Sequence, residues 1–247
     1  MVPETNINDF INRLRATGEV NLVSIILYGS AAAGDYVAGQ SDVNLLCILR
    51  ETSFTSLQAL APAVGWWREQ KNRMPLVLGI EELKRSADVF SIELMDMRQI
   101  YRVLWGEDVL STLVIPARFH RVQLEYELRE KTILLRQGLL LANGDADAMW
   151  ELMLRSLPAF ATLFRHALLE LGEPAAASKR EAVQKLAEKI GFDAAPFLQM
   201  IEIREGKPDS KTADLDVNDL CARYLKTVEQ VTAAVDKMLD SSAPVTT

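Results

Sequence analysis

The sequence predicts an α+β protein in which a small α/β unit is followed by an antiparallel helical bundle. Apolar runs of strand length alternate with helical spacing over about the first hundred residues, and after Gly106 only helical spacing remains. At 247 residues the chain is long enough for one large domain or two modest ones with a substantial core. Strands followed by helices alone are typical of an α+β arrangement or of two domains.

The first half alternates helices with strands. Two of the expected strands are nearly continuous apolar runs, which is typical of strands covered on both faces. Pro62 predicts an interruption in the helix that contains it. The run FSIELMDM predicts a further strand, although its periodicity also allows a helix. The expected elements are a helix over 5–18, strands over 20–28 and 43–49, a helix over 54–71, a strand over 75–80, a short helix ending at 85 and a strand over 90–97.

The second half is expected to be helical throughout. Pro116 can open a long helix, and Asn143-Gly144-Asp145 reads as a turn between two helices. The expected helices cover 116–142, 146–171, 179–190, 194–204 and 217–239. The predicted domains are therefore 1–108 and 116–240, with a disordered tail over 241–247.

Composition narrows the function classes. The formal net charge of −7 argues against a dedicated nucleic-acid binder, which usually has a basic excess. The two cysteines, Cys47 and Cys221, lie far apart and suggest neither a disulfide framework nor a zinc site. The N-terminus does not read as a signal peptide, and no apolar run is long enough to span a membrane. We therefore expect a cytoplasmic protein.

The most informative stretch runs from Leu27 to Leu46. An apolar strand leads into Gly29-Ser30, and the next strand opens with Asp42-Val43-Asn44. Gly29 lets the backbone turn closely, although a tight turn alone also accounts for Gly-Ser. Side chains 42 and 44 project on the same face because strand side chains alternate. Paired oxygen ligands at such a place suit magnesium, which shares them with substrate phosphates.

Gly29-Ser30, Gly34 and Ser41-Asp42-Val43-Asn44 together resemble the signature of the DNA polymerase beta-type nucleotidyltransferase superfamily. Minimal nucleotidyltransferases and aminoglycoside adenylyltransferases, which are bacterial, are the most similar members. The resemblance implies a small mixed-sheet nucleotidyltransferase domain followed by a helical bundle. The residue-level match covers about twenty positions, and the order of the two halves extends it loosely over the chain.

The resemblance also implies roles for individual residues. Gly29 and Ser30 would bind the triphosphate of ATP or another nucleoside triphosphate, and Asp42 and Asn44 would bind Mg²⁺. The family places a third carboxylate on a later strand, where it ligates metal and can act as the base. Glu93, a lone charge in an apolar run, is the candidate for this metal-binding and catalytic role, with Asp96 as runner-up. The alternative is an edge strand with Glu93 in solvent.

Asn44 stands where the family carries a second aspartate, so the metal site lacks one full negative charge. Nucleotidyl transfer relies on metal electrostatics, and this weakens its main source of rate. The leading hypothesis is a transferase that moves a nucleoside monophosphate from Mg–NTP to a hydroxyl of a small molecule or protein. The alternative is a catalytically inactive nucleotide-binding or protein-interaction member, either antitoxin-like or a scaffold, and a homodimer through the helical domain would fit it.

Other residues attract functional interpretations. Trp66-Trp67 could stack on a base, but an anchor for an amphipathic helix is the simpler expectation. The histidines, His120 and His166, are too isolated in the sequence for a metal site or a catalytic dyad. Arg50, Lys71 and Arg73 are candidates, by proximity only, for neutralising the triphosphate.

Overall fold

The computed structural model describes residues 4–18, 20–33, 42–176, 178–206 and 216–240. Within them the chain divides into two compact units, residues 1–119 and 120–247. Gly34 and Ser41 of the motif, and the predicted tail over 241–247, lie outside the described residues. In the part of the chain that is described, no helix is both long and apolar enough to cross a membrane.

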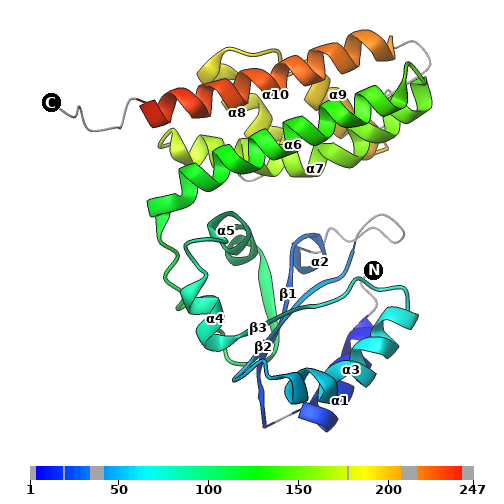
Figure 1. The fold of residues 1–247 in the computed structure, drawn as a ribbon, viewed down its shortest axis with the longest axis vertical. Coiled ribbons are helices and arrows are strands. Elements are labelled where there is room, and N and C mark those ends of the chain that lie inside the picture. Colours follow the sequence, from blue (N-terminus) through cyan, green and yellow to red (C-terminus); the bar gives the residue numbers. More distant parts are fainter. Residues whose placement is uncertain (1–3, 19, 34–41, 177, 207–215, 241–247) are drawn as a thin grey trace, which may run out of the picture. The chain divides into compact units, whose positions relative to one another are not determined.

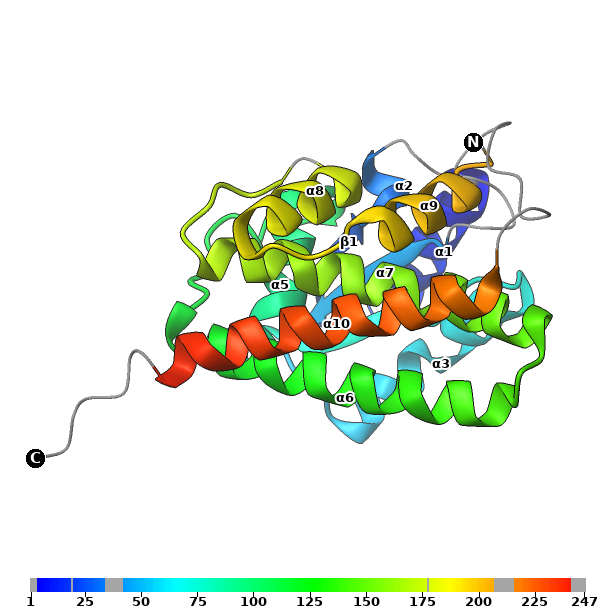
Figure 2. The ribbon, with the colours of Figure 1, turned by 90° about the horizontal axis from the view of Figure 1, so that it is seen from above.

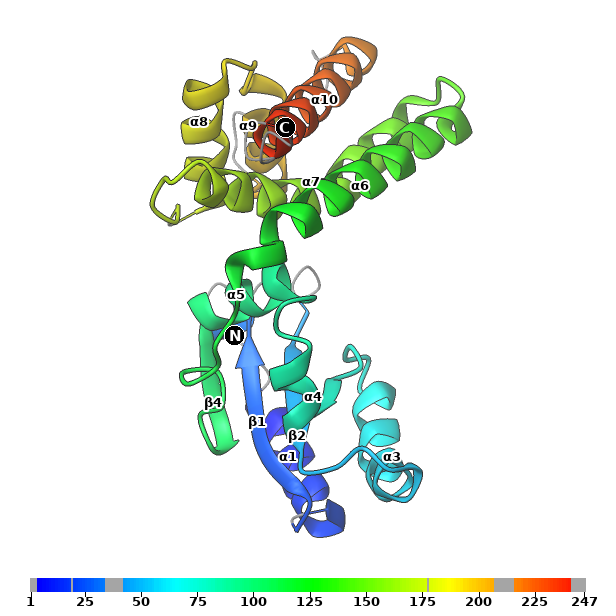
Figure 3. The same ribbon diagram turned by 60° about the vertical axis from the view of Figure 1, so that its left-hand side comes forward.

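The first unit is built on a four-stranded mixed sheet with the order β3-β2-β1-β4. β1 (Leu22–Tyr28) pairs antiparallel with β2 (Asn44–Leu49) and with β4 (Tyr101–Gly106) (Figure 3). β3 (Leu76–Gly79) pairs parallel with β2. The apolar runs in β1 and β2 form buried central strands, as predicted. β3 follows the buried Pro75 and lies at the edge of the sheet.

Helices cover both faces of this sheet (Figure 1). α1 (Glu4–Gly18) and α3 (Phe54–Glu69) pack on one face, where Ile25, Leu27 and Leu45 join their cores. α4 (Ile80–Arg85) and α5 (Ser91–Gln99) pack on the other, against Ile26 and Leu46. Neighbouring side chains of one strand thus enter opposite cores because of the period of two. α2 (Ser30–Ala33) is a single turn after β1.

Two expectations for this unit are corrected, and one strand was not expected. The run over 90–97 is not a strand: it forms most of α5, whose buried side chains Ser91, Leu94 and Met97 recur every three residues and whose first turn carries Glu93. The fourth strand is β4, in which aromatic and branched apolar residues surround a single charged one, Arg102. Pro62 does not interrupt α3, which continues through it.

The regular elements in the described residues of the second unit are all helices, as predicted. Its long helices are α6 (His120–Ala142), α7 (Ala146–Glu170) and α10 (Val217–Asp240), and each packs on the other two (Figure 2). α8 (Lys179–Ile190) and α9 (Ala195–Arg204) pack on α7. A short 3₁₀ turn, η1 (Ala117–Phe119), precedes α6 where the sequence predicted the helix itself to begin.

Candidate functional site

The end of β1 and the start of β2 meet at one end of the sheet. Tyr28, the last residue of β1, pairs with Asn44, the first residue of β2. The Gly29 turn therefore lies beside the strand entry that carries Asp42 and Asn44, because an antiparallel pair brings the end of one strand to the start of its partner. The structure thus brings together the two halves of the motif that the sequence separates by eleven residues.

Gly29 occupies a conformation and a space that favour glycine. Its φ is +76°, and a Cβ added there would lie 3.4 Å from the side-chain nitrogen of Asn44. Its amide donates to the carbonyl of Ile100 (3.2 Å), and its own carbonyl accepts from the amides of Ala32 and Ala33. The backbone of Ser30 begins α2, whereas its side chain lies outside what the structure describes.

Asp42 is exposed and faces a cation supplied by the chain itself. Its Oδ2 lies 3.7 Å from Nη1 of Arg73, and about two-thirds of each side chain is exposed (65% and 66%). Asn44 is half-buried. Burial raises the pKa of the neighbouring Tyr28 phenol, and the positive charge of Arg73 offsets part of that rise. Arg73 is therefore near both strands of the motif.

A core contact holds Arg73 in this place. The indole Nε1 of Trp67 donates to the carbonyl of Arg73 at 2.8 Å. Trp67 is fully buried in α3 and stacks on Phe10 of α1 with ring centroids 4.7 Å apart. Lys71, with φ +61°, ends the helix and turns the chain toward β3. Trp67 therefore lies in the core, as expected, and positions the loop that carries Arg73.

Glu93 was selected as a lone charge on an expected strand over 90–97, but these residues form most of helix α5. Glu93 is exposed in the first turn of α5. Asp96 lies one helical turn before Ile100, whose carbonyl binds Gly29. The metal-binding and catalytic role of Glu93 stays a prediction, without the reason that supported it.

The strand that runs parallel to β2 is β3, and its register identifies the residue beside Asn44. Leu46 pairs with Leu76, and continuing that offset places Met74 next to Asn44. Met74 is exposed and carries no charge. Sequence reasoning missed this position because the pairing of β2 with β3 cannot be deduced from either strand alone.

These residues do not fit a magnesium site of the family's kind. The strand entries offer one carboxylate, Asp42, and one amide, Asn44, while Arg73 adds a positive charge. Among the described residues, no group of three His, Cys, Asp or Glu side chains is placed to hold a metal ion. Two catalytic magnesium ions need several carboxylates to offset their charge. The described edge is suited to an anion rather than to a pair of divalent cations.

The basic candidates separate in space. Arg50 follows β2 at the end opposite Asn44, and its Nε donates to the carbonyl of Val20 at 3.2 Å. Of the three basic candidates, it is Arg73 that pairs with Asp42. Proximity in the sequence could not make this distinction.

The two histidines that seemed isolated in the sequence meet in the helical unit. Nε2 of His120 lies 2.7 Å from Nδ1 of His166, and Nδ1 of His120 contacts a carboxylate oxygen of Glu170. Both imidazoles are buried. They meet although they are isolated in the sequence, because the antiparallel packing of α6 and α7 brings the first turn of one helix to the last turns of the other.

Comparison with known proteins bears on the fold. No protein-family model matches the sequence, and no curated protein matches it either. The crystal structure of the spectinomycin adenyltransferase AAD(9) from Enterococcus faecialis, with ATP and spectinomycin, matches with a TM-score of 0.56 and 15% identity, over 92% of this chain and 98% of that one. The fold is that of a nucleotidyltransferase. The match includes the helical half as well as the sheet, because it spans nearly the whole of both chains.

A nucleotidyltransferase-like protein from Exiguobacterium sibiricum 255-15 matches with a TM-score of 0.39 and 13% identity, over 94% of this chain and 78% of that one. At these identities the likeness concerns the fold alone.

Proposed function

We propose that this chain binds a nucleoside triphosphate at the edge of the sheet formed by Gly29, Asp42, Asn44 and Arg73, and that it transfers the nucleotide slowly. One observation carries the proposal: the pairing of Tyr28 with Asn44 places a close backbone turn beside polar side chains of the next strand. A glycine turn of this kind allows a phosphate to approach the backbone. The adenyltransferase that shares this fold was crystallised with ATP, which supports ATP as the nucleotide.

Slow transfer follows from the charges at the strand entries. Mg²⁺ bound there would find one carboxylate oxygen from Asp42 and one amide oxygen from Asn44, with Met74 beside them. Phosphoryl and nucleotidyl transfer depend mainly on positioning and on metal electrostatics. The acceptor, in this proposal, is a hydroxyl of a small molecule, in keeping with the spectinomycin bound to the structural neighbour.

Isothermal titration with ATP in millimolar Mg²⁺ tests the binding step. Gly29→Ala introduces a Cβ near Asn44 in a left-handed backbone conformation, and Asn44→Ala removes a polar group from the edge. We expect each variant to weaken ATP binding by about tenfold, the loss of one to two hydrogen bonds. Arg50→Ala, at the opposite end of β2, is the matched control and should bind as the wild type does.

The same titration can overturn the proposal. Wild-type protein that gives no heat at millimolar ATP, with an intact circular dichroism spectrum, does not bind the nucleotide. ATP binding that neither Gly29→Ala nor Asn44→Ala changes takes place elsewhere on the chain.

The transfer step has its own test, in which the missing carboxylates are restored. Asn44→Asp with Met74→Glu adds two acids, one at the start of β2 and one two residues before β3, which the register of the two strands places side by side. Pyrophosphate release with ATP, Mg²⁺ and spectinomycin should rise by at least about tenfold over the wild type, because bound metal then stabilises the leaving group. An unchanged rate together with unchanged Mg²⁺ affinity would mean that these two positions do not share a site.

A further inference from the structure

We propose that Arg73 takes the place of a divalent cation at the nucleotide phosphates, so that ATP binding does not require Mg²⁺. The inference rests on the proposed function, since it concerns how that same edge holds a triphosphate. It starts from the disagreement between the residues present and the metal that the family resemblance implies.

The first step is the charge of the edge. The charged side chains that the structure pairs there are one carboxylate, Asp42, and one guanidinium, Arg73, and their charges cancel. A site for two divalent cations instead gathers several negative ligands. A guanidinium at the same place offers charged donors to a multiply charged anion such as a triphosphate.

The second step is the ion pair itself. Arg73 and Asp42 lie 3.7 Å apart, longer than a charge-assisted hydrogen bond, and both side chains are largely exposed. Exposed pairs of this kind contribute little to stability. A phosphate can therefore displace the carboxylate, because the planar guanidinium fork matches two phosphate oxygens at once.

The third step is the anchoring of Arg73. The backbone of Arg73 is fixed by the hydrogen bond from the buried indole of Trp67, and Trp67 in turn stacks on Phe10. The side chain can move while the backbone from which it extends is held by the core. Less freedom is lost on binding when the donor is already positioned.

The role of Asp42 then reverses. In a metal site Asp42 holds the cation and its removal abolishes nucleotide binding. In an arginine site the same carboxylate repels the phosphates and competes for Arg73, so that its removal strengthens binding. The sign of the effect of Asp42→Asn distinguishes the two arrangements.

The experiment is an ATP titration of the full chain in Mg²⁺ and, separately, in excess EDTA. We expect wild-type dissociation constants in the two buffers to agree within about threefold. Arg73→Ala should weaken binding by about tenfold or more in both buffers, since it removes a charge-assisted contact. Asp42→Asn should bind ATP in EDTA at least as tightly as the wild type does. Arg50→Ala is the matched control, an exposed arginine outside the edge.

Each outcome of these titrations either supports or overturns the arginine site. Binding that needs Mg²⁺ and is lost in Asp42→Asn overturns the arginine site and leaves the proposed nucleotide binding intact. Binding in EDTA that Arg73→Ala leaves unchanged also overturns it. No binding in either buffer overturns the proposed function and this inference with it. Circular dichroism spectra of the variants, expected to match the wild type because both residues are exposed, confirm that the chain is folded.

Discussion

His120 and His166 are separated by 46 positions, yet a hydrogen bond joins their rings inside the helical unit. The carboxylate of Glu170 can only accept, so Nδ1 of His120 carries the proton that it donates to Glu170. Nε2 of His120 shares the second hydrogen bond, 2.7 Å long, with Nδ1 of His166. The chain of three side chains satisfies buried polar atoms at the first turn of α6.

Removing His166, one end of this chain of side chains, should therefore lower stability. His166→Leu removes the hydrogen-bond partner of Nε2 of the buried His120. We expect this to lower the free energy of unfolding by about 1–3 kcal/mol. Glu170→Gln keeps an oxygen for His120 and should cost less. Urea unfolding of the full chain, followed by circular dichroism, measures both. A His166→Leu chain as stable as the wild type would contradict this account.

Residue identity alone predicted part of the candidate site. Gly29, Asp42 and Asn44 could be selected because strand ends and alternation are local properties of the sequence, and the strands meet where that selection requires. Arg73 could not be singled out, because its place depends on a hydrogen bond from Trp67 and on the strand order.

At the scale of elements, β4 ends at a glycine, Gly106, that lies too close to β1 to tolerate a side chain. Gly106 has φ +82°, and a Cβ added there would lie 2.1 Å from the carbonyl oxygen of Val23 in β1. A backbone atom cannot move aside as the end of a flexible side chain can. The close approach therefore requires glycine at this residue.

Gly106→Ala should destabilise the first unit strongly. We expect a loss of at least about 2 kcal/mol, from the left-handed conformation and the contact together. Gly29→Ala is the matched comparison, because its φ is similar (+76°) but its nearest contact would be 3.4 Å away, so it should lose less. The difference between the two urea midpoints isolates the contact with Val23. Equal midpoints would show that the backbone conformation alone matters.

Most of the element order could be predicted from the sequence. The exceptions are helix α5, which was expected to be a strand, and strand β4, which follows it. The run FSIELMDM contains enough apolar residues to pass for a strand, but three-residue recurrence and early acids favour the helix that forms. The true strand, β4, is partly exposed along its length, so it lacks the continuous apolar run that marked β1 and β2.

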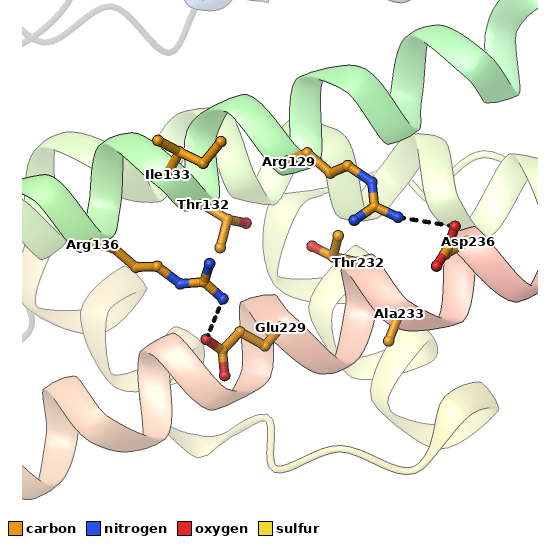
Figure 4. A pocket seen from close by; sticks show the side chains of 8 residues that line it. All are labelled: Arg129, Thr132, Ile133, Arg136, Glu229, Thr232, Ala233 and Asp236. Atoms are coloured by element: carbon orange, nitrogen blue, oxygen red, sulfur yellow. Dashed lines mark hydrogen bonds and ion pairs between the residues drawn. The ribbon is translucent and has the colours of Figure 1, made fainter.

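At the scale of the whole molecule, α6 exposes apolar side chains along one line. We call Val122, Tyr126, Ile133 and Leu140 the α6 strip; the last three recur every seven residues, and Leu140 is 80% exposed. Ile133 of the strip also lines a pocket of about 280 Å³ between α6 and α10 (Figure 4). Its arginines, Arg129 and Arg136, are paired with Asp236 and Glu229 of the same chain.

Because those flanking charges are already compensated, the strip suits a neutral, similar surface, and we expect a second copy of this chain to cover it. Sedimentation equilibrium of the full chain should show a dimer that Leu140→Glu dissociates. Leu134→Glu, on the same helix and 52% exposed but outside the strip, is the control and should leave the dimer intact. A wild-type monomer at micromolar concentration would contradict the prediction.

The short third strand affects how readily copies of the protein can pair through their sheets. β3 lies at the border of the sheet with only four residues, and the ring of Pro75 before it has no N–H to offer a neighbour. A strand from another molecule therefore finds few free backbone hydrogen-bonding groups along β3. This edge of the sheet, beside the loop that carries Arg73, is therefore a poor template for intermolecular strand pairing.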